Sequence, residues 1–99
     1  MSDQATPIRR ALADSRIQEI MGARLRAWRE GAGLSLEQLG ARAGLSPLTL
    51  HKAEHGGNFT MRTLIRILRA LGRVEQLDAF LPPVATSPLD LVSKEPDGR

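Results

Sequence analysis

Two histidines and a glutamate stand close together in the stretch HKAEH, at His51, Glu54 and His55. The order H-x-x-E-H is typical of zinc enzymes, in which two histidines on one helical face hold the metal and a glutamate handles water. Such a site needs a third ligand further along the chain and a glutamate that is free to act on water. Gly56-Gly57 is expected to fray the helix at His55, and only a small hydrophobic helix and a tail follow. We therefore predict no catalytic residue, no metal site and no cofactor, and keep zinc chemistry as an alternative.

The composition is that of one small globular domain. The chain has 99 residues, of which 41% are hydrophobic and 25% charged, and it has no cysteine. Disulfides, thiolate metal sites and cysteine nucleophiles are therefore excluded. No apolar run approaches the ~20 residues of a membrane span, and the start MSDQATPIRR lacks the apolar core of a signal peptide. We expect a cytoplasmic protein with no membrane partner.

Positive charge is concentrated in the middle of the chain. Residues 22–73 carry nine basic and three acidic side chains, a net charge of +6, whereas residues 1–21 are neutral and residues 74–99 carry −3. A block of this kind attracts a polyanion such as DNA. The alternative is that these arginines only solvate helix faces, and charge alone does not separate the two.

Apolar spacing predicts a first helix from about residue 15 to Gly31 or Gly33, with Asp14 or Ser15 as its cap. Its apolar stripe consists of Ile17, Ile20, Met21, Leu25 and Trp28. Trp28 could stack on bases, but its position in this stripe favours the core.

Two short helices follow. Ser35 and Gln38 have the spacing of a capping box, which predicts a helix over 36–43. Ser46 as a cap and Pro47 at the first helical position predict the next helix, over 47–54. We expect the latter helix to turn Leu50 and Ala53 inward. Its outward residues are then Pro47, Leu48, His51 and Lys52.

The last two helices are expected from Thr60 to Gly72 and over about 74–81. The inward residues of the former would be Met61, Leu64, Ile65, Leu68 and Leu71. The apolar residues of the latter are Val74, Leu77, Phe80 and Leu81. No stretch alternates as a strand does. The sequence thus predicts an all-α bundle of five short helices: a flexible N-terminal segment over 1–14, a domain over 15–81, and a proline-bearing, acidic, partly disordered tail over 82–99.

The stretch LSLEQLGARAGLSPLTLHKAE resembles the helix-turn-helix of the Cro and lambda-repressor (XRE) class. The matching positions are Leu34, Ser35, Leu39, Gly44, Leu45, Ser46, Thr49, Leu50 and Glu54. With the flanking helices, the resemblance covers roughly residues 18–81. It implies a lambda-repressor-like fold whose third helix lies in a DNA major groove. It also implies that Glu54 pairs internally, with an arginine of the first helix as the expected partner.

The resemblance implies a set of DNA-binding residues. They are Ser35, Gln38, Ser46, Pro47, Leu48, Thr49, His51, Lys52, Asn58 and Arg62. The family commonly has a phosphate-binding glutamine where this chain has Leu36, and neither Pro47 nor Leu48 can make a bidentate base contact. We therefore expect His51 at a base edge, Lys52 and Thr49 on phosphate, and much of the specificity from DNA shape. Leu48 could instead contact a protein partner, and Arg66, Arg69 and Arg73 form a solvated face or an interface.

Helix-turn-helix modules commonly pair about a two-fold axis and bind palindromic operators. The residues available for a homodimer interface are Val74, Leu77, Phe80 and Leu81, although they could also close the monomer core. Leu81-Pro82 and Ser87-Pro88-Leu89-Asp90-Leu91 resemble the tail of HipB-type antitoxins. That resemblance implies an autoregulatory repressor in the bacterial cytoplasm, associated with the nucleoid, that also binds a HipA-like kinase toxin. A stand-alone XRE-type regulator and a protein-interaction module with weak DNA affinity remain alternatives.

Overall fold

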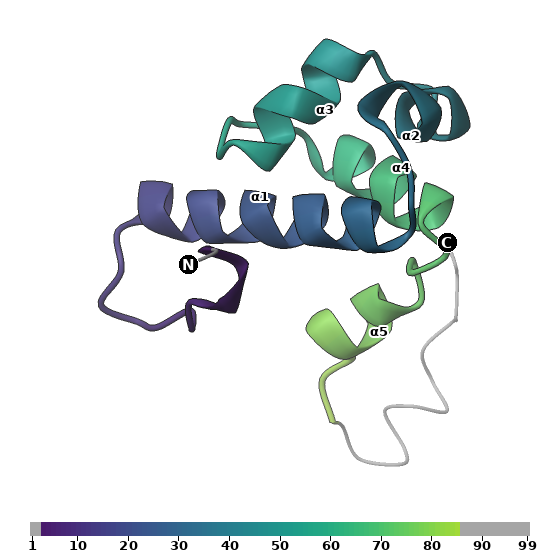
Figure 1. The fold of residues 1–99 in the computed structure, drawn as a ribbon. Helices are drawn as coiled ribbons and strands as arrows, with labels where there is room; N and C mark the ends of the chain where they lie inside the picture. Colours follow the sequence, from purple (N-terminus) through teal and green to yellow (C-terminus); the bar gives the residue numbers. More distant parts are fainter. Residues whose placement is uncertain (1–2, 86–99) are drawn as a thin grey trace.

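The computed structural model describes residues 3–85, and this part of the chain is helical without a strand. A single 3-10 turn, η1 (Asp3–Ala5), precedes five α-helices (Figure 1). The helices are α1 (Asp14–Gly31), α2 (Leu36–Ala43), α3 (Pro47–Glu54), α4 (Met61–Ala70) and α5 (Gln76–Phe80). The predicted all-α fold of five helices is confirmed. The tail motif over 87–91 lies outside the described residues.

The start of α1 differs from the prediction. Ala13 occupies the N-cap position, and no side chain caps the helix, so the expected cap by Asp14 or Ser15 is wrong. Asp14 instead lies in the first turn, where its negative charge is favourable near the positive end of the helix dipole. At the other end, Gly33 adopts a left-handed conformation, with φ of 74°, and the chain turns towards α2.

The caps of α2 and α3 are those expected. The Gln38 backbone N–H donates to Ser35 Oγ at 3.0 Å, and the Ser35 N–H donates to Gln38 Oε1 at 2.8 Å, which confirms the capping box. At α3, the Thr49 N–H donates to Ser46 Oγ at 3.0 Å, and Pro47 is the first helical residue. The two helices of the motif therefore begin where the sequence predicts.

The inward face of α4 was predicted only in part. Met61 is 73% exposed, whereas Ile67, which was not expected inside, is 1% exposed. Met61 is the first residue of α4 and lies at the end of the stripe, while Ile67 sits beside Leu68 on the face that meets the core. Helix α5 is also shorter than the expected 74–81, because Val74 and Glu75 form a turn before it.

The core joins α1, α2, α3 and α4. Its buried residues are Leu25, Leu39, Leu50, Ala53, Ile67 and Leu68. Trp28 packs against this cluster, which confirms its predicted place in the core. The crossing of α1 and α3 is close, because a Cβ added at Gly22 would lie 2.6 Å from the Ala53 carbonyl oxygen. The glycine at position 22 therefore allows α3 to approach α1 more closely than any larger residue would.

The segment before α1 folds back along that helix (Figure 1). Arg16 donates to both carboxylate oxygens of Asp3, at 2.8 and 2.9 Å. Arg24 donates to the carbonyl oxygens of Gln4 and Thr6, at 3.1 and 3.0 Å. None of the helices within residues 3–85 has both the length and the apolar character needed to cross a lipid bilayer.

Candidate DNA-binding surface

A buried ion pair fixes α3 against α1. Arg29 Nε donates to Glu54 Oε2 at 2.7 Å, and Arg29 Nη2 donates to Glu54 Oε1 at 3.0 Å. A third donor, Arg29 Nη1, bonds the Leu34 carbonyl oxygen at 2.8 Å, so one guanidinium joins α1, α3 and the start of the α2 region. Arg29 and Glu54 are 8% and 6% exposed. The expected pairing of Glu54 with an arginine of the first helix is confirmed.

The same contacts decide the interpretation of HKAEH. Both carboxylate oxygens of Glu54 accept hydrogen bonds from Arg29, so the carboxylate is not free to activate water. The rings of His51 and His55 stack on each other, with centroids 4.1 Å apart, and His55 Nδ1 donates to the His51 carbonyl oxygen at 2.8 Å. Within residues 3–85, no third potential ligand joins the two histidines. Their neighbourhood therefore gives no support to the zinc alternative.

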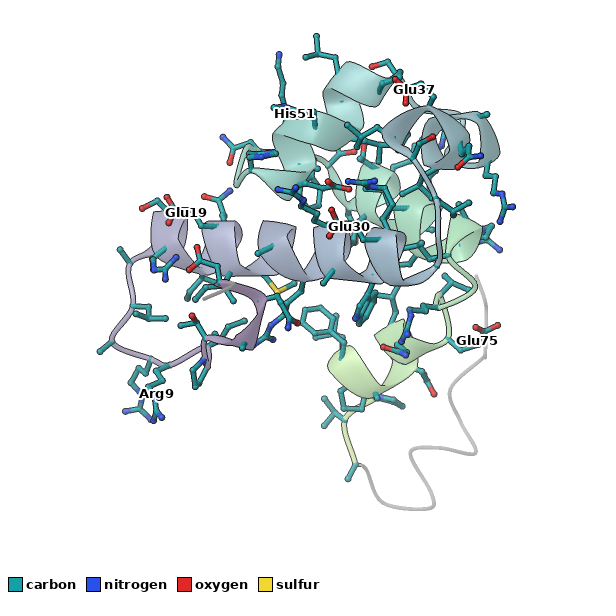
Figure 2. All side chains as sticks on the ribbon, viewed as in Figure 1. Arg9, Glu19, Glu30, Glu37, His51 and Glu75 are labelled. Atoms are coloured by element: carbon teal, nitrogen blue, oxygen red, sulfur yellow. The ribbon has the colours of Figure 1, made fainter. Side chains whose placement is uncertain are left out.

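Helix α3 presents a row of side chains to solvent. Pro47, Leu48, His51 and Lys52 are exposed, while Leu50 and Ala53 are buried, as predicted. His51 is labelled on α3 in Figure 2, and its side chain stacks on that of His55. The row begins at the N-terminus of α3, where the free backbone N–H groups carry partial positive charge. This is the geometry that a helix needs to present side chains in a groove.

The start of α2 is organised by the capping box. Ser35 and Gln38 are both exposed, but each uses one side-chain oxygen in the reciprocal cap. Leu36, which replaces the family's usual glutamine, is half-buried and packs against the core. The substitution therefore exchanges a polar contact at the surface for apolar packing under α2.

The two remaining predicted DNA-binding residues lie at the turn before α4 and at its start. Asn58 is exposed, and its Oδ1 accepts a hydrogen bond from Gln18 Nε2 at 2.6 Å. Arg62 is exposed in the first turn of α4. Gln18 was not predicted at this surface, because the 40 residues that separate it from Asn58 leave no local signal. The bond ties the turn after α3 to α1.

The predicted dimer residues divide into two pairs. Val74 and Leu77 pack against the core, whereas Phe80 and Leu81 are 67% and 73% exposed. Phe80 and Leu77 line an apolar groove of ≈ 310 Å³ between α1, α4 and α5, together with Trp28. Arg73 lies over the Trp28 ring, with its guanidinium carbon 4.3 Å from the ring centroid. Helix α5 therefore contributes Leu77 to the monomer core and Phe80 to an apolar surface.

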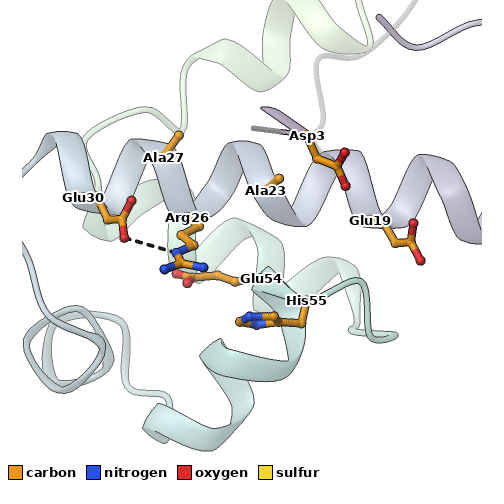
Figure 3. A pocket seen from close by; sticks show the side chains of 8 residues that line it. All are labelled: Asp3, Glu19, Ala23, Arg26, Ala27, Glu30, Glu54 and His55. Atoms are coloured by element: carbon orange, nitrogen blue, oxygen red, sulfur yellow. Dashed lines mark hydrogen bonds and ion pairs between the residues drawn. The ribbon is translucent and has the colours of Figure 1, made fainter. Parts of the chain in front are cut away.

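A second hollow, of ≈ 560 Å³, lies where α1 meets the end of α3 (Figure 3). Its carboxylates are engaged with arginines: Glu30 with Arg26 at 3.1 Å, and Asp3 with Arg16 at 2.8 Å. The hydrogen bond from Arg16 holds the pKa of the Asp3 carboxyl below its ordinary value. Because these charges are already paired, the hollow does not offer a separate acidic site.

This geometry agrees with the family to which the sequence is similar. The profile of a family described as a helix-turn-helix domain matches residues 20–80, which is more than half of the chain and spans α2 and α3 with their flanking helices. A search of curated proteins found no match. The matched region contains the Arg29–Glu54 pair, both capped motif helices and the exposed row of α3. The chain therefore belongs to the helix-turn-helix domain family of DNA-binding regulators.

Proposed function

We propose that this protein is a sequence-specific, double-stranded DNA-binding transcriptional repressor of the XRE class. The observation that carries the proposal is the exposed row of Pro47, Leu48, His51 and Lys52 on a helix whose opposite face is fixed by the buried Arg29–Glu54 pair. A rigid helix with one free face can enter a major groove as a unit, so little conformational entropy is lost on binding.

In the proposed complex, the N-terminus of α3 lies in the major groove. Lys52 and Thr49 contact phosphate with their side chains. Ser35, Gln38 and Ser46 lie at the starts of α2 and α3, where backbone N–H groups face phosphate. His51 reaches a base edge, and Leu48 contacts a thymine methyl group. Asn58 and Arg62 bind phosphate beside α4. Since few of these side chains can make bidentate base contacts, DNA shape supplies much of the specificity.

We propose that the repressor is a homodimer on a palindromic operator. Two recognition helices must then lie one helical turn, ~34 Å, apart. Phe80 and Leu81 support this part of the proposal, because they extend the packed Val74 and Leu77 into a surface that a second copy would cover.

The biological role that we propose is autoregulation, with the chain as the antitoxin of a HipBA-like pair. It rests on the resemblance of Leu81-Pro82 and of residues 87–91 to the tails of HipB-type antitoxins. The partner would be a HipA-like kinase toxin, and the place of action would be the bacterial cytoplasm, on the nucleoid. A stand-alone XRE-type regulator would have the same DNA-binding surface without the toxin. The proposal includes no enzymatic activity and no cofactor.

The test is fluorescence anisotropy with a labelled duplex from immediately upstream of the gene and a scrambled duplex of the same composition. We expect tight binding to the first duplex, weaker binding to the second, and a steep loss of affinity as salt rises. Lys52→Ala should weaken binding to both duplexes alike, whereas His51→Ala should reduce the preference between them. Equal, weak binding of the unmodified protein to both duplexes would refute sequence-specific repression from this operator.

A second candidate function is supported by Leu48. This side chain is 62% exposed and stands next to Pro47, and neither side chain has a donor or acceptor for a hydrogen bond to a base edge. Such a pair suits an apolar protein contact as well as a thymine methyl. Leu48→Asn distinguishes the two functions: it would alter the preference for base sequence in a DNA-binding protein and leave DNA binding unchanged in a protein-interaction module.

A further inference from the structure

Four arginines on α2 and α4 have no carboxylate within ion-pair distance among residues 3–85. All four side chains are exposed; they are Arg42, Arg62, Arg66 and Arg69. The sequence explains part of this, because no acidic residue occurs between Glu54 and Glu75, and Glu54 is already committed to Arg29. The positive charge of this surface is therefore not compensated by the part of the chain that the structure describes.

Three of these arginines share one line on α4. Arg62, Arg66 and Arg69 are separated by four and three residues, which places them on the same side of a helix. Ile67 and Leu68 face the opposite way, into the core. Like charges at these spacings repel each other and destabilise a helix by a few tenths of a kcal/mol per pair. The arrangement is therefore slightly unfavourable in the isolated protein.

The line of arginines passes close to the start of the proposed recognition helix. Arg66 Nη1 lies 3.5 Å from the carbonyl oxygen of Gly44, in the turn that joins α2 to α3. Gly44 is two residues before Ser46, the N-cap of α3, and Arg42 is in the last turn of α2. Figure 1 shows α4 beneath α2, which is the motif helix that contacts it. Arg66 is therefore next to the turn that leads into the proposed recognition helix.

The chemistry of this surface favours phosphate over a protein partner. Protein interfaces usually have an apolar centre. The large exposed hydrophobic side chains within residues 3–85 do not include any between Arg62 and Arg69. Guanidinium groups match phosphate oxygens in geometry and charge. DNA presents one such charge per ~1.7 Å of duplex axis, so it can engage several arginines at once.

From these observations we infer that Arg42, Arg66 and Arg69 form a second phosphate-binding surface, which contacts the DNA backbone beside the groove entered by α3. The inference rests on the proposed DNA binding and extends it to the α2–α4 side of the domain. These contacts are independent of base sequence. They add affinity, and they hold the orientation of the domain on the duplex.

The test uses a duplex of mixed sequence of about four helical turns, ~40 base pairs, titrated by anisotropy between ~50 and ~200 mM salt. The variant is Arg66→Gln with Arg69→Gln. The matched control is Arg9→Gln with Arg10→Gln, which removes the same charge from two exposed arginines on the N-terminal segment, on the other side of α1 from α2 and α3 (Figure 2). A thermal melt of each variant checks that the fold is retained.

Two lost phosphate contacts should lower the slope of log affinity against log salt by ~1.8 in magnitude, since each contact contributes ~0.9. The control should keep the slope of the unmodified protein, and Arg66→Lys with Arg69→Lys should keep most of it, because the charge remains. Equal slopes for the variant and its control would overturn the inference, as would unchanged DNA binding together with loss of an acidic protein partner.

This outcome is separable from that of the proposed function. Sequence preference between upstream and scrambled duplexes, with no effect of the arginine variant, would uphold the repressor and reject the second surface. A reduced salt slope in the variant, with no preference between the duplexes, would uphold the phosphate surface and reject the sequence-specific repressor.

Discussion

The arginines of α1 and those of α2 and α4 differ in what surrounds them. Of the four arginines on α1, three (Arg16, Arg26 and Arg29) each hold a carboxylate at 2.7 to 3.2 Å, and Arg24 bonds backbone carbonyl oxygens of the N-terminal segment. On α2 and α4, Arg42 and Arg66 hold none among residues 3–85. In the first group, Arg16 docks the N-terminal segment, Arg29 docks α3, and Arg26 pairs with Glu30 on its own helix. The charge of the second group is not neutralised by a nearby carboxylate and is available to a ligand outside the protein.

The difference shows that the net charge of a segment counts paired and unpaired arginines alike. The +6 of residues 22–73 includes Arg29, whose charge is neutralised inside the protein by Glu54, and Arg26, which pairs with Glu30 one turn away. Only the uncompensated arginines can attract DNA over a distance, because the field of a close ion pair falls off quickly. If paired and unpaired arginines differ in this way, removing a buried partner should destabilise the fold far more than removing an unpaired arginine.

The largest effect is expected at the buried pair. Glu54→Ala leaves the Arg29 guanidinium buried without its carboxylate, and this should lower the free energy of unfolding by ~3–5 kcal/mol. Urea unfolding followed by circular dichroism measures the change. Glu30→Ala is the matched control, because it breaks the exposed pair with Arg26 and should cost no more than ~1 kcal/mol. Equal losses in the two variants would mean that burial does not distinguish these ion pairs.

The next effect concerns the contact that brings Glu54 to Arg29. A Cβ at Gly22 would lie 2.6 and 2.7 Å from the carbonyl oxygens of Ala53 and Glu54, so Gly22→Ala must separate α1 from α3 and should cost ~1–3 kcal/mol. Gly31→Ala, in the last turn of the same helix, meets no atom within 4 Å and should be stabilising by ~0.5–1 kcal/mol. Thermal unfolding of the two variants compares them; two changes of the same sign would argue against a close helix crossing.

The local part of this architecture was predictable from sequence. The caps at Ser35, Ser46 and Thr60 are confirmed because a cap depends on residues within one turn of it. The Arg29–Glu54 pairing was also expected, but that expectation came from the resemblance, since spacing alone does not connect residues 25 positions apart. The exposed row of α3 followed from the periodicity of the helix.

What the sequence did not predict depends on tertiary contacts. Met61 and Ile67 exchanged their expected burial because the apolar pattern of α4 is broad, and the neighbouring helices decide which part of it is covered. The hydrogen bond between Gln18 and Asn58 could not be predicted either, because the two residues are 40 positions apart. Arg66 has no carboxylate within ion-pair distance among residues 3–85. This could not be predicted, because a sequence does not give distances between side chains. Beyond the Arg29–Glu54 pair, the contacts that hold the candidate surface in place were thus not predictable from the sequence.

A smaller effect is expected when an unpaired arginine is removed without DNA. Arg66→Gln should change the free energy of unfolding by less than ~0.5 kcal/mol, because the side chain is exposed and its bond to the Gly44 carbonyl, at 3.5 Å, is long. Relief of repulsion from Arg62 and Arg69 would offset even that loss. Urea unfolding in low salt provides the measurement. A loss above ~1 kcal/mol would place Arg66 with the structural arginines of α1, and would contradict the division between the two groups.

The smallest effect separates the paired arginines among themselves, and it appears with pH. The hydrogen bond from Arg16 keeps the folded-state pKa of Asp3 below its ordinary 3.8. A lowered carboxyl pKa stabilises the docked segment above pH 3.8, and this contribution disappears as the pH falls through the lower, folded-state pKa. An NMR titration of the Asp3 carboxyl carbon should therefore show a midpoint below 3.8, and Arg16→Gln should return it towards that value. The bonds from Arg24 to the Gln4 and Thr6 carbonyls do not depend on the Asp3 carboxylate, so the segment should loosen at Asp3 first. An Asp3 midpoint that is the same with and without the Arg16 side chain would show that this exposed pair, unlike Arg29–Glu54, does not hold its partner.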